Sequence, residues 1–167
     1  TVAAEVGITT FRLTGGEPLL RPDVVDIVRR LAMITSPSGT VEVAMTTNGI
    51  RLAPMLSDLV AAGLGRLNVS LDTLDRERFT ALTRRDRLDD VLAGIAAAAR
   101  SELRPLKLNA VAMRGVNDDA LTDLVEFALA HDAEMRFIEQ MPLDVEHTWS
   151  RQGMVTRDEI LTALASK

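Results

Sequence analysis

The residues best suited to chemistry lie in the stretch Arg12-Leu-Thr-Gly-Gly-Glu-Pro18, where an apolar strand is predicted to end in a glycine-rich turn. Glycine has no side chain to cover the backbone, so the N–H groups of this turn are open to a ligand. Pro18 is expected to stop an early helix. Uncovered N–H groups beside the Glu17 carboxylate suit a small ligand with both an ammonium and a carboxylate group. A bare pair of glycines would indicate an ordinary turn, but Glu17 and Arg12 favour a site.

Two further stretches carry polar residues at the predicted carboxyl end of a strand, where ligands bind in parallel α/β folds. They are Thr46-Thr-Asn-Gly49 and Asn68-Val-Ser-Leu-Asp72, and the second places Ser70 at the mouth of the site. Plain structural roles remain as alternatives. The first stretch is also typical of an Asn-Gly turn, and Asp72 would also serve as a cap on the following helix.

The elements that position these stretches alternate between strand and helix. Strands are predicted at 8–13, 41–46, 66–71, 106–112 and 134–139, and helices at 22–34, 53–62, 75–82, 87–100, 118–131 and 156–166. This alternation predicts a parallel sheet with right-handed crossovers, either an open doubly wound sheet or an arc of a β/α barrel.

Several helix boundaries have a local cause in the sequence. Gly7 would end a helix that opens the chain, and Pro22 suits a first helical position. Asp75 and Asn117 are predicted N-caps. A capping box is predicted at the start of the last helix, formed by Thr156 and Glu159.

Residue parity within the strands favours the barrel. Both faces of an open α/β sheet lie under helices and should be apolar, whereas each predicted strand here has one apolar and one polar face. The polar faces include Arg12, Thr46, Ser70, Lys107 and Arg136. A closed barrel fills its interior with apolar side chains, so the pattern predicts an incomplete, splayed barrel with a polar lumen. Three lumenal cations in an acidic chain indicate an anionic ligand.

The amino-acid composition limits the classes of function that the chain can have. The chain has 167 residues, 47% of them hydrophobic, which fits one domain or a large piece of one. A net charge of −5 argues against a nucleic-acid or membrane surface and fits a cytoplasmic protein. No cysteine is present, which excludes disulfides and iron–sulfur ligation by these residues. Two histidines, His131 and His147, are too few for a metal centre. No membrane-spanning run or signal peptide is predicted.

Taken together, these motifs resemble the MoaA-type radical S-adenosylmethionine enzymes, the GTP 3′,8-cyclases. The resemblance rests on Arg12–Pro18, Thr46–Gly49, Asn68–Asp72, Gly115-Val-Asn-Asp118 and Arg136-Phe-Ile-Glu-Gln-Met-Pro142, and it extends over essentially the whole chain. Gly-Gly-Glu-Pro alone would indicate only the superfamily. The last motif, followed by Trp149, is much more specific.

The resemblance implies a lyase of molybdenum cofactor biosynthesis. In this family a 4Fe–4S cluster, held by a Cys-x3-Cys-x2-Cys loop, cleaves S-adenosylmethionine to a 5′-deoxyadenosyl radical. The radical takes the hydrogen from C3′ of GTP, and C3′ then bonds to C8 to give (8S)-3′,8-cyclo-7,8-dihydroguanosine 5′-triphosphate. A second cluster binds the guanine. No catalytic residue is assigned in this chain.

The resemblance also assigns binding roles to residues of this chain. Four residues would contact S-adenosylmethionine: Gly16, Ser70, Met141 and, near the methionyl amine, Glu17. Four would contact GTP: Arg12, Thr46, Lys107 and Arg136. It further implies that a cyclic pyranopterin monophosphate synthase acts downstream, and it is compatible with a homodimer.

The chain departs from the family at both ends, since the first strand, its cysteines and the second cluster region are not in it. We therefore expect residues 1–167 to be the central part of a partial-barrel domain with about five strands. This part is expected to bind no cluster and to be inactive alone. The predicted strand 8–13 would have an open edge, which favours instability or edge-to-edge association.

Two other functions stay open. One is a cluster-less paralogue that binds a nucleotide or S-adenosylmethionine without chemistry. The other is a radical S-adenosylmethionine enzyme that acts on a different anionic substrate.

Overall fold

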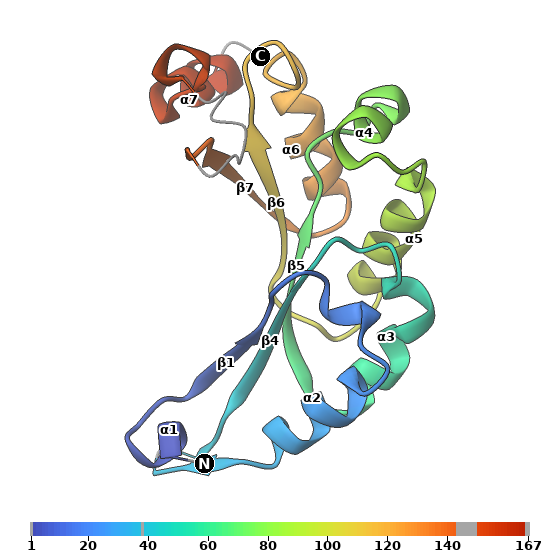
Figure 1. Ribbon diagram of the computed structural model, residues 1–167, viewed down its shortest axis with the longest axis vertical. Helices are drawn as coiled ribbons and strands as arrows, with labels where there is room; N and C mark the ends of the chain where they lie inside the picture. The colour runs from blue at the N-terminus through green and yellow to red at the C-terminus, as the bar shows by residue number, and fades with distance from the viewer. Residues whose placement is uncertain (1, 38, 143–149, 166–167) are drawn as a thin grey trace. The chain divides into compact units, whose positions relative to one another are not determined.

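The computed structural model describes residues 2–37, 39–142 and 150–165, which form an α/β fold (Figure 1). Five strands form one parallel sheet in the order β1-β4-β5-β6-β7, and β2 and β3 form a separate antiparallel ribbon. The order of the five strands follows the chain without reversal, whereas a doubly wound sheet reverses at its switch point. The predicted fold, an incomplete parallel β/α barrel of about five strands, is therefore confirmed. Among the described strands β1 pairs with β4 alone, which makes it an edge strand in this part of the chain.

The predicted strands are all present. Their bounds are β1 Thr10–Leu13, β4 Glu42–Thr47, β5 Leu64–Ser70, β6 Leu106–Ala112 and β7 Glu134–Glu139. The helices are α1 Val2–Glu5, α2 Val24–Ala32, α3 Leu52–Ala61, α4 Arg76–Thr83, α5 Leu88–Ala99, α6 Leu121–Ala130 and α7 Arg157–Ala165. Four short elements were not predicted: β2 Thr35–Ser36, β3 Gly39–Thr40 and the 3₁₀ helices η1 Pro18–Leu20 and η2 Arg151–Gly153. None of the described helices is long and apolar enough to cross a membrane.

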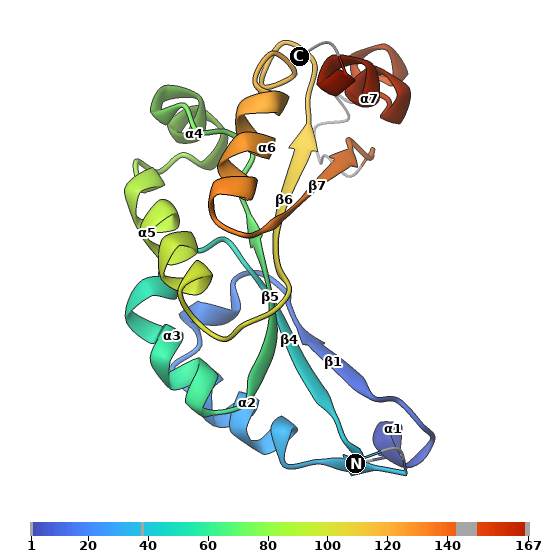
Figure 2. The same cartoon turned by 180° about the vertical axis from the view of Figure 1, so that it is seen from behind.

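The chain divides into two compact units. The first comprises Thr1–Ser70 and Asp89–Lys107, and the second comprises Leu71–Leu88 and Leu108–Lys167. In the first unit β4 pairs in parallel with both β1 and β5. Helices α2, α3 and α5 lie on the same side of these strands, as Figures 1 and 2 show from opposite directions. The assignment of residues 1–167 to a single domain stays a prediction.

The predicted alternation of apolar and polar faces is present in the first unit. Val43, Met45 and Leu67 are buried and in register with the apolar face of β1. A β-bulge interrupts the pairing of β4 with β5: Val43 is opposite Leu64, but Ala44 is opposite Arg66. The extra residue in β5 lets Leu64 and Leu67, three positions apart, both be buried.

Gly49 fixes the turn that follows β4. It has a φ of 79°, in the left-handed region, and a Cβ at this position would lie 2.9 Å from Val69 Cγ1 and 3.1 Å from Val91 Cγ1. The neighbouring Asn48 accepts a hydrogen bond from the Ile50 amide at 3.0 Å through its side-chain oxygen. The predicted Asn-Gly turn is confirmed, and close packing against the core adds to its rigidity.

The second unit has its own small core. Buried Ala112, Leu121, Val155 and Ile160 form a cluster to which the half-buried Phe137 and Leu164 add apolar area. This cluster joins β6, α6, β7 and α7. It explains why the segment before α7 lies against this unit, since burial of apolar area is the main favourable term in such packing.

Two of the predicted helix boundaries that involve proline are wrong. Pro18 was expected to stop a helix, but it is the first residue of η1, because its fixed φ and missing N–H suit that position. Pro22 was expected to open α2, which instead begins at Val24. The Asp23 carboxylate ahead of that helix is bonded to the Arg21 guanidinium at 2.8 and 3.0 Å.

Other predicted boundaries are confirmed. Gly7 follows α1 with a φ of 95° and donates a hydrogen bond to the Ala4 carbonyl at 3.0 Å. The Asp75 carboxylate caps α4, accepting from the Arg78 amide at 2.8 Å.

Candidate functional site

The carboxylate of Glu17 accepts three hydrogen bonds from groups of the first unit. Its Oε1 accepts from the Thr47 hydroxyl at 2.6 Å and from the Leu19 amide at 3.0 Å. Its Oε2 accepts from the Asn48 amide at 2.7 Å. The residue is half-buried, and within the described part of the chain all its partners are uncharged. Glu17 therefore holds together the loops that follow β1 and β4 through uncharged partners.

The glycine turn beside Glu17 is open. A Cβ at Gly15 or at Gly16 would meet no atom within 4 Å, and both residues are exposed. A ligand could therefore approach the backbone closely here, as the sequence predicted. Gly16 and Glu17, two of the predicted contacts of S-adenosylmethionine, lie next to each other at this open edge.

Two of the predicted GTP contacts meet on the polar face of the first unit. Arg12 Nη1 donates to Thr46 Oγ1 at 3.3 Å. Ala44, which is opposite Arg12 in the strand register, lies two residues before Thr46 on that face and has a small side chain. Arg12 is exposed, and the Thr46 hydroxyl is its partner among the described residues. This guanidinium has no carboxylate partner in that part of the chain, so an anionic ligand would meet a cation that is not already neutralised.

Arg66 is a cation of the same face that the sequence did not single out. It is opposite Ala44 on the other side from Arg12. Its Nη2 pairs with the Glu42 carboxylate, which also accepts from the Thr10 hydroxyl at 3.3 Å. Its Nε is buried without a partner in the described structure. One feature of the sequence could have identified it: Arg66 lies two residues before Asn68, and so on the same polar side of the strand.

The remaining predicted contacts are divided between the units. Ser70 is exposed at the last residue of β5, and Lys107 is half-buried near the start of β6. In the second unit Arg136 Nε pairs with Glu134 Oε1 at 2.9 Å, and Met141 is 58% exposed. Arg12 and Thr46 are thus the pair of predicted contacts that the structure brings together, whereas Gly16 and Glu17 are already neighbours in the sequence. Trp149 and His147 lie outside the described residues.

Asn117 was expected to cap a helix, and that expectation is wrong; the structure also gives Asp72 a role other than the helix cap that was its structural alternative. The Asp72 carboxylate accepts from the Val111 amide of β6 at 2.8 Å. Asn117 is fully buried, and its Nδ2 donates to the Asp72 and Val111 carbonyls, each at 2.8 Å, while its Oδ1 accepts from the Met113 amide at 2.8 Å. These long-range bonds take the place of capping, and α6 begins later, at Leu121.

Burial sets the ionisation of Asp72. It raises the pKa of the carboxyl group above its ordinary value, and the hydrogen bond from the Val111 amide opposes this without cancelling it. The raised pKa is a consequence of the buried, structural position of Asp72 beside β6, and no chemical step is assigned to this residue.

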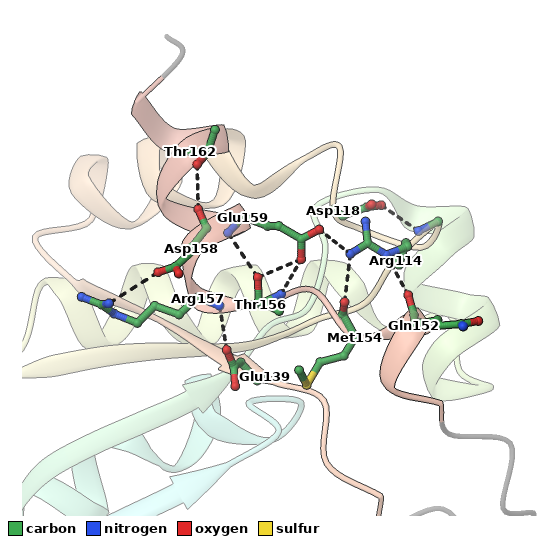
Figure 3. Close-up of polar contacts among 12 residues, drawn as sticks. Arg114, Asp118, Glu139, Gln152, Met154, Thr156, Arg157, Asp158, Glu159 and Thr162 are labelled. Carbon is green, nitrogen blue, oxygen red and sulfur yellow. Dashed lines mark hydrogen bonds and ion pairs between the residues drawn. The ribbon is translucent and has the colours of Figure 1, made fainter.

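A second carboxylate cluster holds the start of α7 in the second unit (Figure 3). Glu159 Oε2 accepts from the Thr156 amide at 2.8 Å and its hydroxyl at 2.9 Å, which confirms the predicted capping box. Glu159 Oε1 accepts from Arg114 Nη2 at 2.7 Å, and the same guanidinium donates to the carbonyls of Gln152 and Met154 at 3.2 and 2.9 Å. The Thr156 amide, then Arg114 and the Thr156 hydroxyl, lower the pKa of Glu159 to about 2.

Comparison with known proteins places the sequence in a family. It matches the radical SAM superfamily over residues 1–128. It is 53% identical to the GTP 3′,8-cyclase of Streptomyces coelicolor over 162 residues, which are 97% of this chain and 47% of that protein. It is 44% identical to GTP 3′,8-cyclase 1 of Mycobacterium tuberculosis strain H37Rv, over 99% of this chain and 46% of that one.

Solved structures show the same fold at low sequence identity. A domain of the pyruvate-formate lyase-activating enzyme from Bacteroides vulgatus superposes with a TM-score of 0.68 at 18% identity, covering 93% of this chain and 92% of that one. TYW1 with a bound lysine-pyruvate adduct superposes with a TM-score of 0.66 at 19% identity, covering 95% and 49%.

The chain therefore belongs to the radical SAM superfamily. It spans about half the length of the curated relatives it matches, 47% in the Streptomyces coelicolor protein.

The residues present fit the two cofactors implied by the family unequally. S-adenosylmethionine carries an ammonium and a carboxylate, and the open Gly16 backbone beside the Glu17 carboxylate suits both groups. A 4Fe–4S cluster needs thiolate ligands, and the 167 residues include no cysteine. Within the described residues no group of three His, Cys, Asp or Glu side chains could hold a metal ion either.

Proposed function

We propose that this chain forms the central part of the substrate site of a GTP 3′,8-cyclase, acting in molybdenum cofactor biosynthesis. The observation that carries the proposal is its 53% identity with a protein of that name over nearly the whole chain. The polar strand face adds chemical support, because a triphosphate needs cations that are not already paired, and Arg12 is such a cation among the described residues.

In this proposal the residues predicted from the sequence bind the two ligands. Arg12, Thr46, Lys107 and Arg136 bind GTP, and guanidinium groups are suited to bidentate contact with phosphate oxygens. Gly16, Glu17, Ser70 and Met141 bind S-adenosylmethionine, which supplies the group that abstracts hydrogen from GTP. Iron–sulfur ligands are not among these residues, and no step is derived through a cluster.

A chimaera tests this function directly. The 162 matching residues of the Streptomyces coelicolor cyclase would be replaced by those of this chain. The purified chimaera would be incubated with GTP, S-adenosylmethionine and a reductant, and the cyclised nucleotide would be measured by mass spectrometry. We expect product from GTP, and a loss of roughly tenfold or more in kcat/KM for GTP when Arg12 is replaced by Met, because a charge-assisted contact with phosphate is removed.

The chimaera also separates the alternatives. If it cleaves S-adenosylmethionine but leaves GTP unchanged, the cyclase proposal is wrong and a different anionic substrate is favoured. If it binds S-adenosylmethionine and GTP without cleaving either, the chain is a binding module. The unmodified relative, assayed in parallel, is the matched control.

We further propose a cytoplasmic location, a downstream cyclic pyranopterin monophosphate synthase that takes the product, and a homodimeric assembly. Cell fractionation and light scattering of the full-length protein test the first and the last. Conversion of the chimaera's product by the synthase tests the second.

A further inference from the structure

Thr47 is buried, with 2% of its surface exposed, although its side chain is polar. Its hydroxyl hydrogen is donated to Glu17 Oε1 at 2.6 Å, and its oxygen accepts from the Gly49 amide at 3.1 Å. Because one hydroxyl has a single hydrogen, the bond from Gly49 fixes which way that hydrogen points. The hydroxyl is thus oriented by a glycine that is itself packed against Val69 and Val91.

The three bonds to Glu17 leave a defined acceptor position. An ionised carboxylate has about four lone-pair sites. Oε1 accepts two bonds, from Thr47 and Leu19, and Oε2 accepts one, from the Asn48 amide. Oε2 therefore keeps one acceptor site, and no cation among the described residues occupies it.

We propose that Thr47 is a positioning residue that turns the Glu17 carboxylate so that Oε2 accepts a hydrogen bond from the ammonium group of an amino-acid ligand. The inference rests on the proposed S-adenosylmethionine site and adds to it a residue from the apolar, helix-covered side of the sheet. Thr47 itself does not touch the ligand. It acts by holding Oε1, and together with the Leu19 and Asn48 amides it restricts rotation about the terminal torsion of the carboxylate, a broad one in glutamate.

Nuclear magnetic resonance of the full 167-residue chain tests this role. Amide shifts would be followed as S-adenosylmethionine is added to the wild type and to Thr47→Val, Thr47→Ala and Thr47→Ser. The same titration with 5′-methylthioadenosine, which lacks the ammonium group, reports on the nucleoside contacts alone. Thr162→Val is a matched control, because that hydroxyl donates only to the Asp158 carbonyl of α7, at 2.7 Å.

We expect Thr47→Val and Thr47→Ala to weaken S-adenosylmethionine binding roughly tenfold, the scale of one charge-assisted hydrogen bond, and Thr47→Ser to stay within about twofold of the wild type. Binding of 5′-methylthioadenosine should be unchanged in all variants. The Asn48 amide resonance should move in both apolar variants and stay in place in Thr47→Ser.

Three results would overturn the proposal: wild-type chain whose Asn48 amide does not respond to S-adenosylmethionine, apolar variants that bind it as tightly as the wild type, or apolar variants that lose both ligands equally. Failure of the cyclase proposal looks different, since this titration contains no GTP. If the chimaera binds S-adenosylmethionine but does not convert GTP, the cyclase proposal is wrong and the proposed role of Thr47 still holds.

Discussion

Two glutamates at the start of helical segments, Glu17 and Glu159, show how similar geometry can serve different ends. Each accepts hydrogen bonds from amides at the beginning of its own helix or turn. Glu159 completes its set with the guanidinium of Arg114, whereas Glu17 completes it with a hydroxyl and an amide. Arg114 neutralises the Glu159 carboxylate, whereas no cation among the described residues contacts the Glu17 carboxylate. A carboxylate that is well bonded but not neutralised is the one prepared for a cationic ligand.

The same distinction separates two arginines of the polar face. Arg66 is paired with the Glu42 carboxylate, whereas the partner of Arg12 among the described residues is a hydroxyl. Residue type alone does not tell the two apart. What distinguishes them is whether the charge already has a counter-ion within the protein.

The largest expected effect follows from Gly49→Ala, because the Gly49 amide bonds to Thr47, which in turn bonds to Glu17. The added methyl group would lie 2.9 Å from Val69 Cγ1 in a left-handed backbone position. We expect the free energy of unfolding to fall by about 2 kcal/mol or more. Urea denaturation of the chain measures it.

Gly115→Ala is the matched control for that change. Gly115 has a φ of 71°, but a Cβ there would meet no atom within 4 Å. Only backbone strain should appear, about 1 kcal/mol. Equal losses at the two glycines would contradict the packing argument.

Removing the cation from the other glutamate is expected to have a smaller, local effect. Arg114→Met deletes the ion pair with Glu159 and two bonds to carbonyls. We expect amides at the start of α7 to exchange with solvent roughly fivefold faster, because the net value of such exposed bonds is modest. Arg157→Met is the control, since the Arg157 side chain pairs, among the described residues, with the neighbouring Asp158 carboxylate at 3.6 Å, and its backbone bond to Glu139 is kept. Similar exchange in both variants would remove Arg114 from this role.

A third carboxylate, Asp72, should make the free energy of unfolding depend on pH. Its folded pKa is raised above the ordinary value of 3.8, so the native state holds its proton more tightly than the unfolded state does. The free energy of unfolding should therefore fall as the pH rises through the folded pKa. Asp72→Asn keeps an oxygen acceptor for the Val111 amide and should remove this pH dependence, with a small gain in stability at neutral pH. Urea denaturation at several pH values checks both.

The smallest effect is expected from titration of Glu159, with the opposite sign. Its pKa falls from 4.5 to about 2 on folding, so its contribution is present above the unfolded value and is lost as the pH falls towards 2. Protection of the first turn of α7 against hydrogen exchange should decline between these limits. In Glu159→Gln the decline should be absent, and an unchanged decline would assign it to another group.

Much of the fold could be predicted because periodicity is local. The bounds of β6 and β7 agree with the predicted strands, and the capping box of Thr156 and Glu159 needs only three residues of sequence. The two-residue strands β2 and β3 were missed, since a pattern of period two cannot be recognised in two residues.

The errors come from bonds between distant residues. Asn117 is a good N-cap by residue type, but its side chain bonds to Asp72 and Val111, 45 and 6 positions away. Thr47 looked like part of a turn, and only the fold brings it to Glu17, 30 positions earlier. Arg66 was passed over although it lies on the same strand face as Asn68, and its pairing with Glu42 across the sheet is visible only in the fold.

The β-bulge between β4 and β5 determines where β5 can change in length. Leu64, Arg66 and Leu67 are opposite Val43, Ala44 and Met45, so Gly65 is the residue without an opposite number in β4. A strand alternates its faces strictly, so a chain without Gly65 would keep Leu64 and Leu67 on one face and Arg66 on the other. The bulge therefore marks a place where the strand can lose one residue without exchanging its two faces.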